Sequence, residues 1–355
     1  MTASIHQLLE VFDEADAQGS MALVLRDIFR RWGFAAEIYA GTIVSPRSGA
    51  RSSYRLDLPG DHSDILIFHY SIGAGSLDLF FRTLRRRVIV YHNVTPAEYF
   101  EGWDSWTALQ CRRGRRELSR LLPTCDLALA DSRFNAAELS ALGFPRIAAL
   151  PFPLNPKLLA GEPDPAVMNT FGKKDRANVL FVGRIAPNKR QDEIIRVFYH
   201  FQKYFQPSSR LILVGAAPIS SYARALERLV RDLGLEGSVH FSGKISGAGL
   251  RAYYRTADLF LCLSDHEGFC VPLIESMYFK IPILAFAAGA IPETLRGAGI
   301  LMRQKDPVET ACLMNRLLAD PSLRRSVLDS QARRWKEVTD FPYAENLRKA
   351  LLPLM

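Results

Sequence analysis

The sequence has little that would place the chain in a membrane or outside the cell. No apolar run approaches the ~20 residues that a bilayer-spanning helix requires. The first residues, 1–7, lack the basic-then-apolar layout of a secretory signal. We therefore expect a cytoplasmic protein.

The sequence also lacks paired cysteines. Its five cysteines are an odd number, lie far apart and form no Cys-x-x-Cys pair. A disulfide framework or a zinc site needs tighter, paired spacing. We therefore expect reduced thiols, most of them buried.

Acidic residues are outnumbered, but only in one half of the chain. Of the net charge of +8, residues 1–170 contribute 18 basic against 19 acidic side chains, and residues 171–355 contribute 27 against 18. Excess positive charge is typical of proteins that bind a nucleotide diphosphate, nucleic acid or an acidic membrane surface. Charge alone does not choose among these ligands.

At 355 residues the chain is long enough for two domains. The first half alternates a helical stretch at 20–32, which Gly33 could cap, with short apolar runs typical of strands. These runs lie at 38–40, 64–70, 88–91 and 127–130. Strands interleaved with helices predict crossover units and a parallel sheet.

Helix and strand breakers then crowd the stretch 145–165, which contains six prolines and Gly161. Proline at this density favours an interdomain linker. Strand-type runs resume at 178–183, 210–215, 239–242, 259–263 and 281–286. The last stretch, 328–352, has a helical pattern broken at Phe341-Pro342, as in a terminal helix that returns to the first domain.

The predicted fold class is therefore α/β, with two Rossmann-like, doubly wound parallel-sheet domains facing each other across a cleft. We expect an N-terminal domain at 1–155, a C-terminal domain at 156–330 and a helical segment at 331–355 that crosses back. In open α/β sheets, ligands bind outside the carboxyl ends of the strands.

The strongest motif directly follows the apolar run 259–263 and spans Asp265 to Glu275, with the sequence DHEGFCVPLIE. Pro272 fits the first turn of a helix, and Gly268 lets a ligand approach the backbone before that turn. The unpaired amides at the helix start would form an anion site.

Its two carboxylates need not share one role, because Glu267 lies in the loop and Glu275 about one turn into the helix. One can accept hydrogen bonds from sugar hydroxyls and the other from a ribose. The alternative interpretation makes Glu267 a helix cap and Glu275 a solvated surface charge.

A second motif, FVGRIAPNKRQD at 181–192, again ends a strand in glycine. Its cations Arg184 and Lys189 lie five residues apart before a helix. Arginine can bind a diphosphate bidentately, and lysine can add a point charge. The alternative is a basic loop on a basic protein.

Together these motifs, Gly-Arg-x-x-x-x-Lys at 183–189 and Glu-Gly-Phe-x-x-Pro-x-x-Glu at 267–275, resemble the donor domain of glycosyltransferase family 4. The resemblance is specific over 175–300 and looser over 1–150. It implies the GT-B fold and retention of anomeric configuration.

The resemblance also implies the residue roles. Arg184 and Lys189 would bind the donor diphosphate, Glu267 the sugar and Glu275 the ribose. The remaining donor-binding residues would be Gly183, the amides of Gly268, Phe269 and Cys270, and Gly243, Lys244 and Ile245, which follow a strand where the family holds the nucleobase.

The first domain adds two candidates by the same resemblance. Gly19, in Asp16-Ala-Gln-Gly19-Ser20, stands where the family's first loop approaches the donor phosphate, although Gln18 replaces the usual paired glycine. His92 ends a strand where the family often places a histidine that contacts the transferred sugar; the alternative is a structural histidine. A partial dinucleotide fingerprint begins at Gly73, but Asp78 replaces its third glycine and we reject it.

Nine arginines lie between Arg82 and Arg120, and Trp103, Trp106 and Leu109 precede the second cluster of them. Aromatic and basic residues on one helix are typical of contact with an anionic membrane, here the inner face of the cell membrane. A solvated basic helix is the alternative. We expect no nucleic-acid partner, because no recognition motif accompanies the charge.

The sequence thus predicts an enzyme that moves a hexose from a nucleoside-diphosphate sugar to a glycan or lipid-linked acceptor in polysaccharide synthesis. Mannose from GDP-mannose is the preferred donor. No cofactor or metal is expected, because no Asp-x-Asp motif ends a strand beside the site. The alternatives are an epimerase of the same fold and a non-catalytic nucleotide-sugar-binding subunit.

Overall fold

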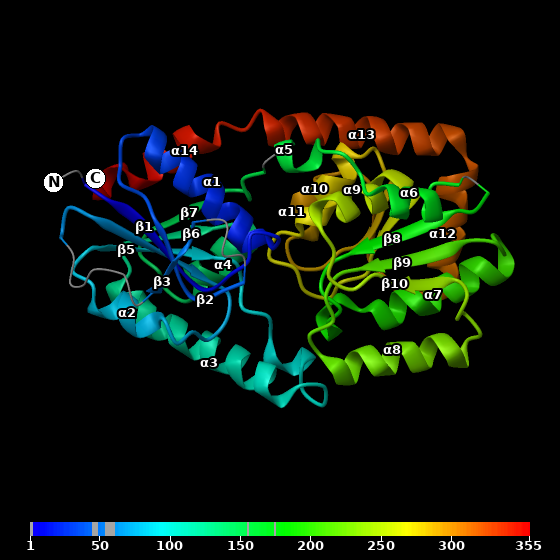
Figure 1. Cartoon of the computed structure of the whole chain (residues 1–355), viewed down its shortest axis with the longest axis horizontal. Helices are drawn as coiled ribbons and strands as arrows, with labels where there is room; N and C mark the ends of the chain where they lie inside the picture. Colours follow the sequence, from blue (N-terminus) through cyan, green and yellow to red (C-terminus); the bar gives the residue numbers. More distant parts are fainter. Residues whose placement is uncertain (1–2, 45–48, 54–60, 155, 174) are drawn as a thin grey trace. The chain divides into compact units, whose positions relative to one another are not determined.

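The computed structural model describes residues 3–44, 49–53, 61–154, 156–173 and 175–355. The chain divides into two compact units, each with its own parallel sheet (Figure 1). Unit 1 comprises residues 1–98, 106–155 and 341–355, and unit 2 comprises residues 99–105 and 156–340. The segment 99–105 belongs to unit 2 although both of its neighbours in sequence belong to unit 1.

Unit 1 contains a seven-stranded sheet in the order β3-β2-β1-β4-β5-β6-β7, in which every paired strand is parallel. The strands are β1 (Ile5–Phe12), β2 (Ile38–Ile43), β3 (Arg51–Ser52), β4 (Ile65–Tyr70), β5 (Arg86–Tyr91), β6 (Leu127–Ala130) and β7 (Ile147–Ala149). The helices are α1 (Ala17–Arg31), α2 (Leu77–Arg82), α3 (Ser105–Leu121), α4 (Arg133–Ala141) and α14 (Tyr343–Leu351).

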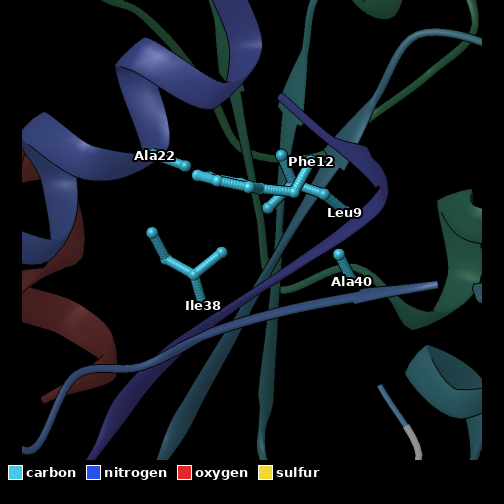
Figure 2. Packing of buried hydrophobic residues seen from close by; sticks show 5 residues of the cluster. All are labelled: Leu9, Phe12, Ala22, Ile38 and Ala40. Carbon is cyan, nitrogen blue, oxygen red and sulfur yellow. The ribbon is translucent and has the colours of Figure 1, made fainter. Parts of the chain in front are cut away.

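The core of this unit forms between strands and a covering helix. Figure 2 shows Leu9 and Phe12 of β1 beside Ala22 of α1 and Ile38 and Ala40 of β2, all fully buried. All six residues of β4 are buried, as expected for a parallel strand covered on both faces. Burial of apolar surface at roughly 25 cal/mol per Å² is the main force that holds such layers together.

Unit 2 contains a six-stranded parallel sheet in the order β10-β9-β8-β11-β12-β13. The strands are β8 (Asn178–Val182), β9 (Arg210–Val214), β10 (Val239–Phe241), β11 (Leu259–Cys262), β12 (Ile283–Phe286) and β13 (Ile300–Met302). The helices are α5 (Pro156–Leu159), α6 (Pro165–Phe171), α7 (Gln191–Tyr204), α8 (Ser220–Asp232), α9 (Gly247–Thr256), α10 (Val271–Tyr278), α11 (Ile291–Leu295), α12 (Pro307–Ala319) and α13 (Pro321–Thr339).

The strand order reverses between β8 and β11, which are neighbours in the sheet but about 80 residues apart in sequence. Such a reversal opens a crevice at the carboxyl ends of the two strands, where doubly wound folds bind ligands. The loops after β8 and β11 carry the two predicted motifs.

The predicted fold class of two doubly wound parallel sheets is confirmed. The C-terminal helix also behaves as predicted: α13 ends at Thr339, Pro342 interrupts the chain, and α14 belongs to unit 1 through its buried Leu347 and Leu351. Among the described residues, no helix is long and apolar enough to cross a membrane.

Two expectations need correction. The sequence pattern missed β1, because its alternation is broken by polar residues such as Gln7, which is nonetheless fully buried. The proline-rich stretch is also not wholly a linker. It includes β7, and Pro165 begins α6, where Asp164 caps the helix and the missing proline N–H costs nothing.

Candidate functional site

The loops that carry the two sequence motifs lie together in unit 2. Strands β8 and β11 pair in parallel, so their carboxyl ends emerge side by side. Beyond the strands, the Asp265 N–H donates to the Asn188 carbonyl at 2.9 Å, and the Asn188 side chain donates to the His266 carbonyl at 3.3 Å. The structure therefore brings two motifs that are distant in sequence into one site.

An ion pair joins the two loops. Lys189 Nζ, at the end of the short helix Pro187–Lys189, lies 2.6 Å from Glu267 Oε2. Only 17% of the lysine side chain and 9% of the glutamate side chain are exposed. Two largely dehydrated opposite charges at this distance hold each other in place, and loss of either partner leaves a costly unpaired charge.

The backbone of Glu267 is also fixed. Its carbonyl accepts a hydrogen bond from the Ala290 N–H at 2.9 Å. Gly289, with φ of +53°, makes this approach possible, since a Cβ there would lie 2.4 Å from the Glu267 carbonyl oxygen. Glu267 does not cap a helix, because the N-cap of α10 is Cys270.

The start of α10 retains the character of an anion site. Cys270 has left-handed backbone angles, with φ of 71°, and makes no side-chain capping bond. The carbonyl of Phe269 accepts a hydrogen bond from the Thr294 hydroxyl, which fixes the turn after Gly268. A helix start without a side-chain cap attracts negative charge through its amides and the helix dipole.

Glu275 is half-buried on α10 and accepts a hydrogen bond from the Tyr254 hydroxyl of α9 at 2.6 Å. Burial raises the pKa of Glu275, and this hydrogen bond partly offsets the rise. Burial, together with the Glu275 charge, also raises the pKa of Tyr254, so the phenol remains a donor. Glu275 is therefore not a simple solvated charge.

Arg184 follows Gly183 directly after β8 and is exposed. Its guanidinium has no hydrogen-bond or ion-pair partner in the described part of the chain, so this cation is available to a ligand. The backbone at Gly183 packs closely against Gly215, which follows β9. Only glycine fits there, because a Cβ at position 215 would lie 2.1 Å from the Gly183 carbonyl oxygen.

The predicted nucleobase segment lies at the end of the next strand. Gly215 forms a bridge with Gly243, which has φ of 66°, and Lys244 and Ile245 follow it before α9. The segment thus lies at the same carboxyl edge of the sheet. Its role in binding stays a prediction.

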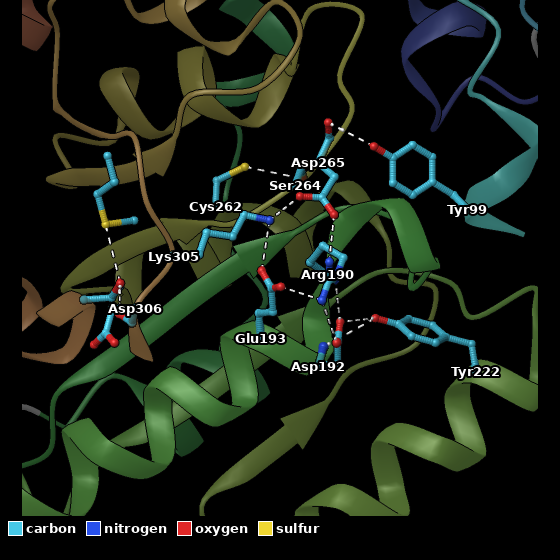
Figure 3. A network of polar contacts seen from close by, with 12 residues as sticks. Tyr99, Arg190, Asp192, Glu193, Tyr222, Cys262, Ser264, Asp265, Lys305 and Asp306 are labelled. Atoms are coloured by element: carbon cyan, nitrogen blue, oxygen red, sulfur yellow. Dashed lines mark hydrogen bonds and ion pairs between the residues drawn. The ribbon is translucent and has the colours of Figure 1, made fainter. Parts of the chain in front are cut away.

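A network of charged side chains, shown in Figure 3, holds Asp265 in the loop after β11. Arg190 Nη1 donates to Asp265 Oδ2 at 2.8 Å, and Lys305 pairs with both Asp265 and Glu193. Tyr222 donates to Asp192, which also pairs with Arg190. Sequence reasoning missed Lys305, because it comes from a loop after β13 with no spacing signal that relates it to Asp265.

One grouping of metal-type ligands occurs among the described residues. The ligand atoms of Cys262, Glu267 and Cys270 all lie within 4.8 Å of one another and are buried. The hydrogen bond to Cys262 and burial raise the pKa of Cys270 well above its ordinary value. A metal would need that thiol deprotonated and would compete with Lys189 for Glu267, so these residues fit a metal poorly.

The two candidates from the first half of the sequence lie in unit 1. Gly19 is buried in the first turn of α1, where a Cβ would lie 2.0 Å from the Asp13 carbonyl oxygen. His92 follows β5, with Nδ1 2.6 Å from Asp131 Oδ2 and Nε2 3.0 Å from His69 Nδ1. Both ring nitrogens are thus engaged within the protein, and sequence reasoning missed Asp131.

The basic stretch divides into two groups. Three arginines are held by contacts within the protein. Arg85 forms an ion pair with Asp64, and Arg115 forms one with Glu138. Arg87 donates to a backbone carbonyl, that of Thr83. Exposed residues of α3 follow one face at helical spacing: Trp106, Leu109, Arg113, Arg116 and Arg120. Of these, Arg113 also pairs with Glu117 at 2.6 Å.

The Glu275–Tyr254 contact yields a test of stability. Tyr254→Phe removes the donor and raises the pKa of Glu275 further, so the ionised carboxylate opposes folding more strongly. We expect unfolding free energy at neutral pH to fall by about 1–3 kcal/mol. The loss should shrink as pH falls and be smallest below about 4.3, the ordinary glutamate pKa, where Glu275 is mostly protonated in both the folded and the unfolded state.

Chemical denaturation at both pH values measures this difference. Tyr199→Phe is the matched control, since the Tyr199 hydroxyl only accepts a hydrogen bond from exposed Lys203. An equal loss at both pH values would mean that the contact does not act through the Glu275 charge.

The sequence comparisons concern mainly the second half of the chain. Residues 167–335 match the family model described as glycosyl transferases group 1. A GDP-mannose-dependent alpha-(1-6)-phosphatidylinositol monomannoside mannosyltransferase of Mycolicibacterium smegmatis is 28% identical over 236 residues, which cover 62% of this chain and 60% of that relative. The chain spans 36–60% of the length of the first curated relatives it matches.

Solved structures match over the whole chain. Sucrose-phosphate synthase from Thermosynechococcus elongatus has a TM-score of 0.73 at 19% identity, covering 99% of this chain and 98% of that one. Anabaena HepE, solved in complex with UDP-glucose, has a TM-score of 0.72 at 16% identity, covering 99% of each chain. These likenesses show a GT-B fold, and the match of residues 167–335 to the glycosyl transferases group 1 model agrees with the resemblance found in the sequence.

Proposed function

We propose that the chain is a retaining, metal-independent glycosyltransferase that moves a hexose from a nucleoside-diphosphate sugar to a glycan or lipid-linked acceptor. The observation that carries this proposal is the Lys189–Glu267 pair at the β8/β11 reversal, with the exposed Arg184 five residues before Lys189 in the sequence. This arrangement offers cations for a diphosphate and a carboxylate for sugar hydroxyls at one edge of the sheet.

The proposed roles of these residues follow from the negative charge that develops on the leaving group during the reaction. As the glycosidic bond breaks, the departing diphosphate gains negative charge. Arg184, Lys189 and the uncapped start of α10 are positive groups held in place before the reaction, and preorganised charges of this kind lower a barrier. Because these groups supply the positive charge, the reaction needs no divalent metal. Retention rests on the family resemblance alone.

The proposed identities of the donor sugar and the acceptor are based on the names of the relatives. The Mycolicibacterium protein is named as GDP-mannose-dependent and as acting on a phosphatidylinositol mannoside. That name supports mannose from GDP-mannose and a lipid-linked acceptor for this chain, in cell-surface polysaccharide or glycolipid synthesis in the cytoplasm. Glu275 would accept hydrogen bonds from the ribose, and the Gly243–Ile245 segment would contact the base.

An assay of diphosphate release tests the proposal. Purified protein is incubated with GDP-, UDP-, ADP- and TDP-sugars, with and without a lipid acceptor extract and with EDTA present. We expect release with GDP-mannose only when acceptor is present, and no loss with EDTA. Arg184→Ala should lower the rate by roughly 100-fold, as for loss of one charge-stabilising group.

Arg228→Ala is the matched control, because Arg228 is an exposed arginine on α8 outside the site. Turnover of donor without acceptor would instead indicate an epimerase, and binding without turnover a non-catalytic subunit. A wild-type rate in Arg184→Ala would show that the diphosphate binds elsewhere.

We also propose that the exposed face of α3 contacts an anionic membrane, where a lipid-linked acceptor would be found. Trp106 is 68% exposed and Leu109 46% exposed, an unusual content of apolar surface for a helix that also carries Arg116 and Arg120. Aromatic residues favour the membrane interface, and arginines favour anionic headgroups.

Sedimentation with phosphatidylglycerol vesicles tests this surface. Arg116→Glu/Arg120→Glu should weaken binding by at least about 30-fold, since each basic residue near the surface contributes about 1 kcal/mol. The control Arg325→Glu/Arg333→Glu makes the same charge change on exposed positions of α13. Equal weakening by both variants would mean that net charge, and not the α3 face, governs binding.

A further inference from the structure

A buried tyrosine of unit 2 commits its hydroxyl to a residue of the predicted donor site. Tyr254 lies on α9 and is 1% exposed. Its hydroxyl donates to Glu275 Oε2 of α10 at 2.6 Å, and it has no second hydrogen-bond partner among the described residues. Breaking this contact would leave both groups unpaired, so the tyrosine fixes the place of the carboxylate.

The tyrosine ring is held as well as its hydroxyl. It stacks on the Phe279 ring, with 5.0 Å between the ring centroids and 6° between the ring planes. Phe279 lies four residues after Glu275, at the end of the same helix, and its N–H donates to the Glu275 carbonyl at 3.1 Å. Residues four apart lie on one face of a helix. One face of α10 therefore contacts Tyr254 at both its hydroxyl and its ring.

The carboxylate of Glu275 has capacity left for a ligand. Glu275 is half-buried, and within the part of the chain that the structure describes its carboxylate has no cationic partner and no hydrogen bond besides the one from Tyr254. An ionised carboxylate has sites for about four hydrogen bonds. A half-buried carboxylate with one bond made is stabilised by further donors, and the two adjacent hydroxyls of a ribose can supply them.

The hydrogen bond from Tyr254 restricts the orientation of this carboxylate. Rotation about the last bond of a glutamate side chain is broad, so an unheld carboxylate presents its oxygens in many directions. A donor fixed at Oε2 narrows this range and thereby sets the direction of Oε1. A group that is oriented before the ligand arrives loses less entropy on binding, and the ligand binds more tightly for that reason.

The same helix begins at the segment that is predicted to contact the nucleobase. Helix α9 starts at Gly247, directly after residues 243–245 and the N-cap Ser246, whose side chain accepts from the Gly249 N–H at 3.1 Å. Tyr254 lies about two turns further along this helix. A helix, and not a long loop, therefore sets the spacing between the predicted base contact and the residue that orients Glu275.

We propose that Tyr254 is a positioning residue for the donor nucleotide: it holds Glu275 in the orientation that accepts hydrogen bonds from the ribose hydroxyls, and it thereby makes the site selective for ribonucleotides. This inference deepens the proposed function and rests on the assignment of Glu275 to the ribose made there. Tyr254 itself does not touch the ligand, because its hydroxyl is committed to Glu275 and its ring is buried against Phe279.

A purely structural role of Tyr254 predicts a different result. A contact that only joins α9 to α10 lowers stability when it is lost, and it weakens the binding of all nucleotides alike. A contact that positions Glu275 weakens the binding only of nucleotides that carry ribose hydroxyls. The affinity ratio between a ribonucleotide and its dideoxy counterpart therefore isolates the positioning role.

Isothermal titration calorimetry with GDP and 2′,3′-dideoxy-GDP measures this ratio, and UDP with its dideoxy counterpart is measured in parallel. We expect the wild-type protein to bind the ribonucleotide at least about tenfold more tightly, as for a hydrogen bond to a charged group. In Tyr254→Phe this preference should fall to about threefold or less, because the carboxylate loses its fixed orientation, while the affinity for the dideoxy compound stays within about twofold.

Tyr253→Phe is the matched control. Tyr253 precedes Tyr254 on α9 and is 4% exposed, and its hydroxyl lies 3.0 Å from His240 Nε2. The control thus removes a buried hydroxyl from the same helix without removing the donor to Glu275, and it should keep the wild-type preference for the ribonucleotide. An equal loss of preference in both variants would overturn the specific role of Tyr254.

Tyr254→Phe leaves the Glu275 carboxylate without its donor, so the same change is also made in Glu275→Gln, where no charge is left unpaired. Since Tyr254 acts through the carboxylate, its replacement should change the ribonucleotide preference of Glu275→Gln by less than about twofold. A further loss of preference in the double variant would show that Tyr254 acts on the ribose directly, and the positioning role would be wrong.

The outcomes also separate this inference from the proposed function. If neither GDP nor UDP binds to the wild-type protein, the donor site is wrong, and the proposed function and this inference fail together. If a nucleotide binds with a ribose preference that Tyr254→Phe leaves unchanged or increases, the donor site stands and only the role of Tyr254 is wrong.

Discussion

A largely buried carboxylate requires a positive partner, and in unit 2 that requirement organises the site. Glu267 and Lys189 lie 2.6 Å apart, each fixed by its own backbone environment. Their meeting depends on the strand order, because β8 and β11 are neighbours in the sheet although they are distant in sequence. It also depends on Gly289, whose missing Cβ leaves room for the Glu267 backbone. The Lys189–Glu267 pair therefore depends on the strand order, on the backbone conformation at Gly289 and on the attraction between the two charges.

The sheet of unit 1 also carries polar side chains at the carboxyl ends of its strands. There His92 lies in a row of hydrogen-bonded side chains, between His69 and Asp131, and both of its ring nitrogens are engaged within the protein. In both units, charged groups stand at the carboxyl ends of parallel strands. Doubly wound folds favour this placement because helices cover the faces of the sheet and leave the strand ends for chemistry.

Local patterns were sufficient to predict much of this molecule. The motif Glu-Gly-Phe-x-x-Pro-x-x-Glu identified the loop and helix around Glu267 and Glu275, because a glycine, a helix-starting proline and carboxylates occur at fixed spacing. The alternation of apolar runs and helices likewise predicted the parallel sheets. Such signals lie within a few residues of one another, which is why one sequence can display them.

Contacts between distant segments could not be predicted in this way. Nothing in the sequence indicates that Lys305 neutralises Asp265, or that Tyr254 donates to Glu275. Gln7 illustrates the same limit, since a polar residue in a strand looked like a break in the pattern. It is buried because His69 and the Ala22 carbonyl satisfy its amide. These partners become visible only when the strand order is known.

The most direct measurement is a crystal structure of the chain with GDP bound. We expect diphosphate oxygens within hydrogen-bond distance of the Arg184 guanidinium and Lys189 Nζ, and ribose hydroxyls donating to the Glu275 carboxylate. A nucleotide bound away from the β8 and β11 loops, with Arg184 still directed to solvent, would contradict the central claim that these loops form the donor site.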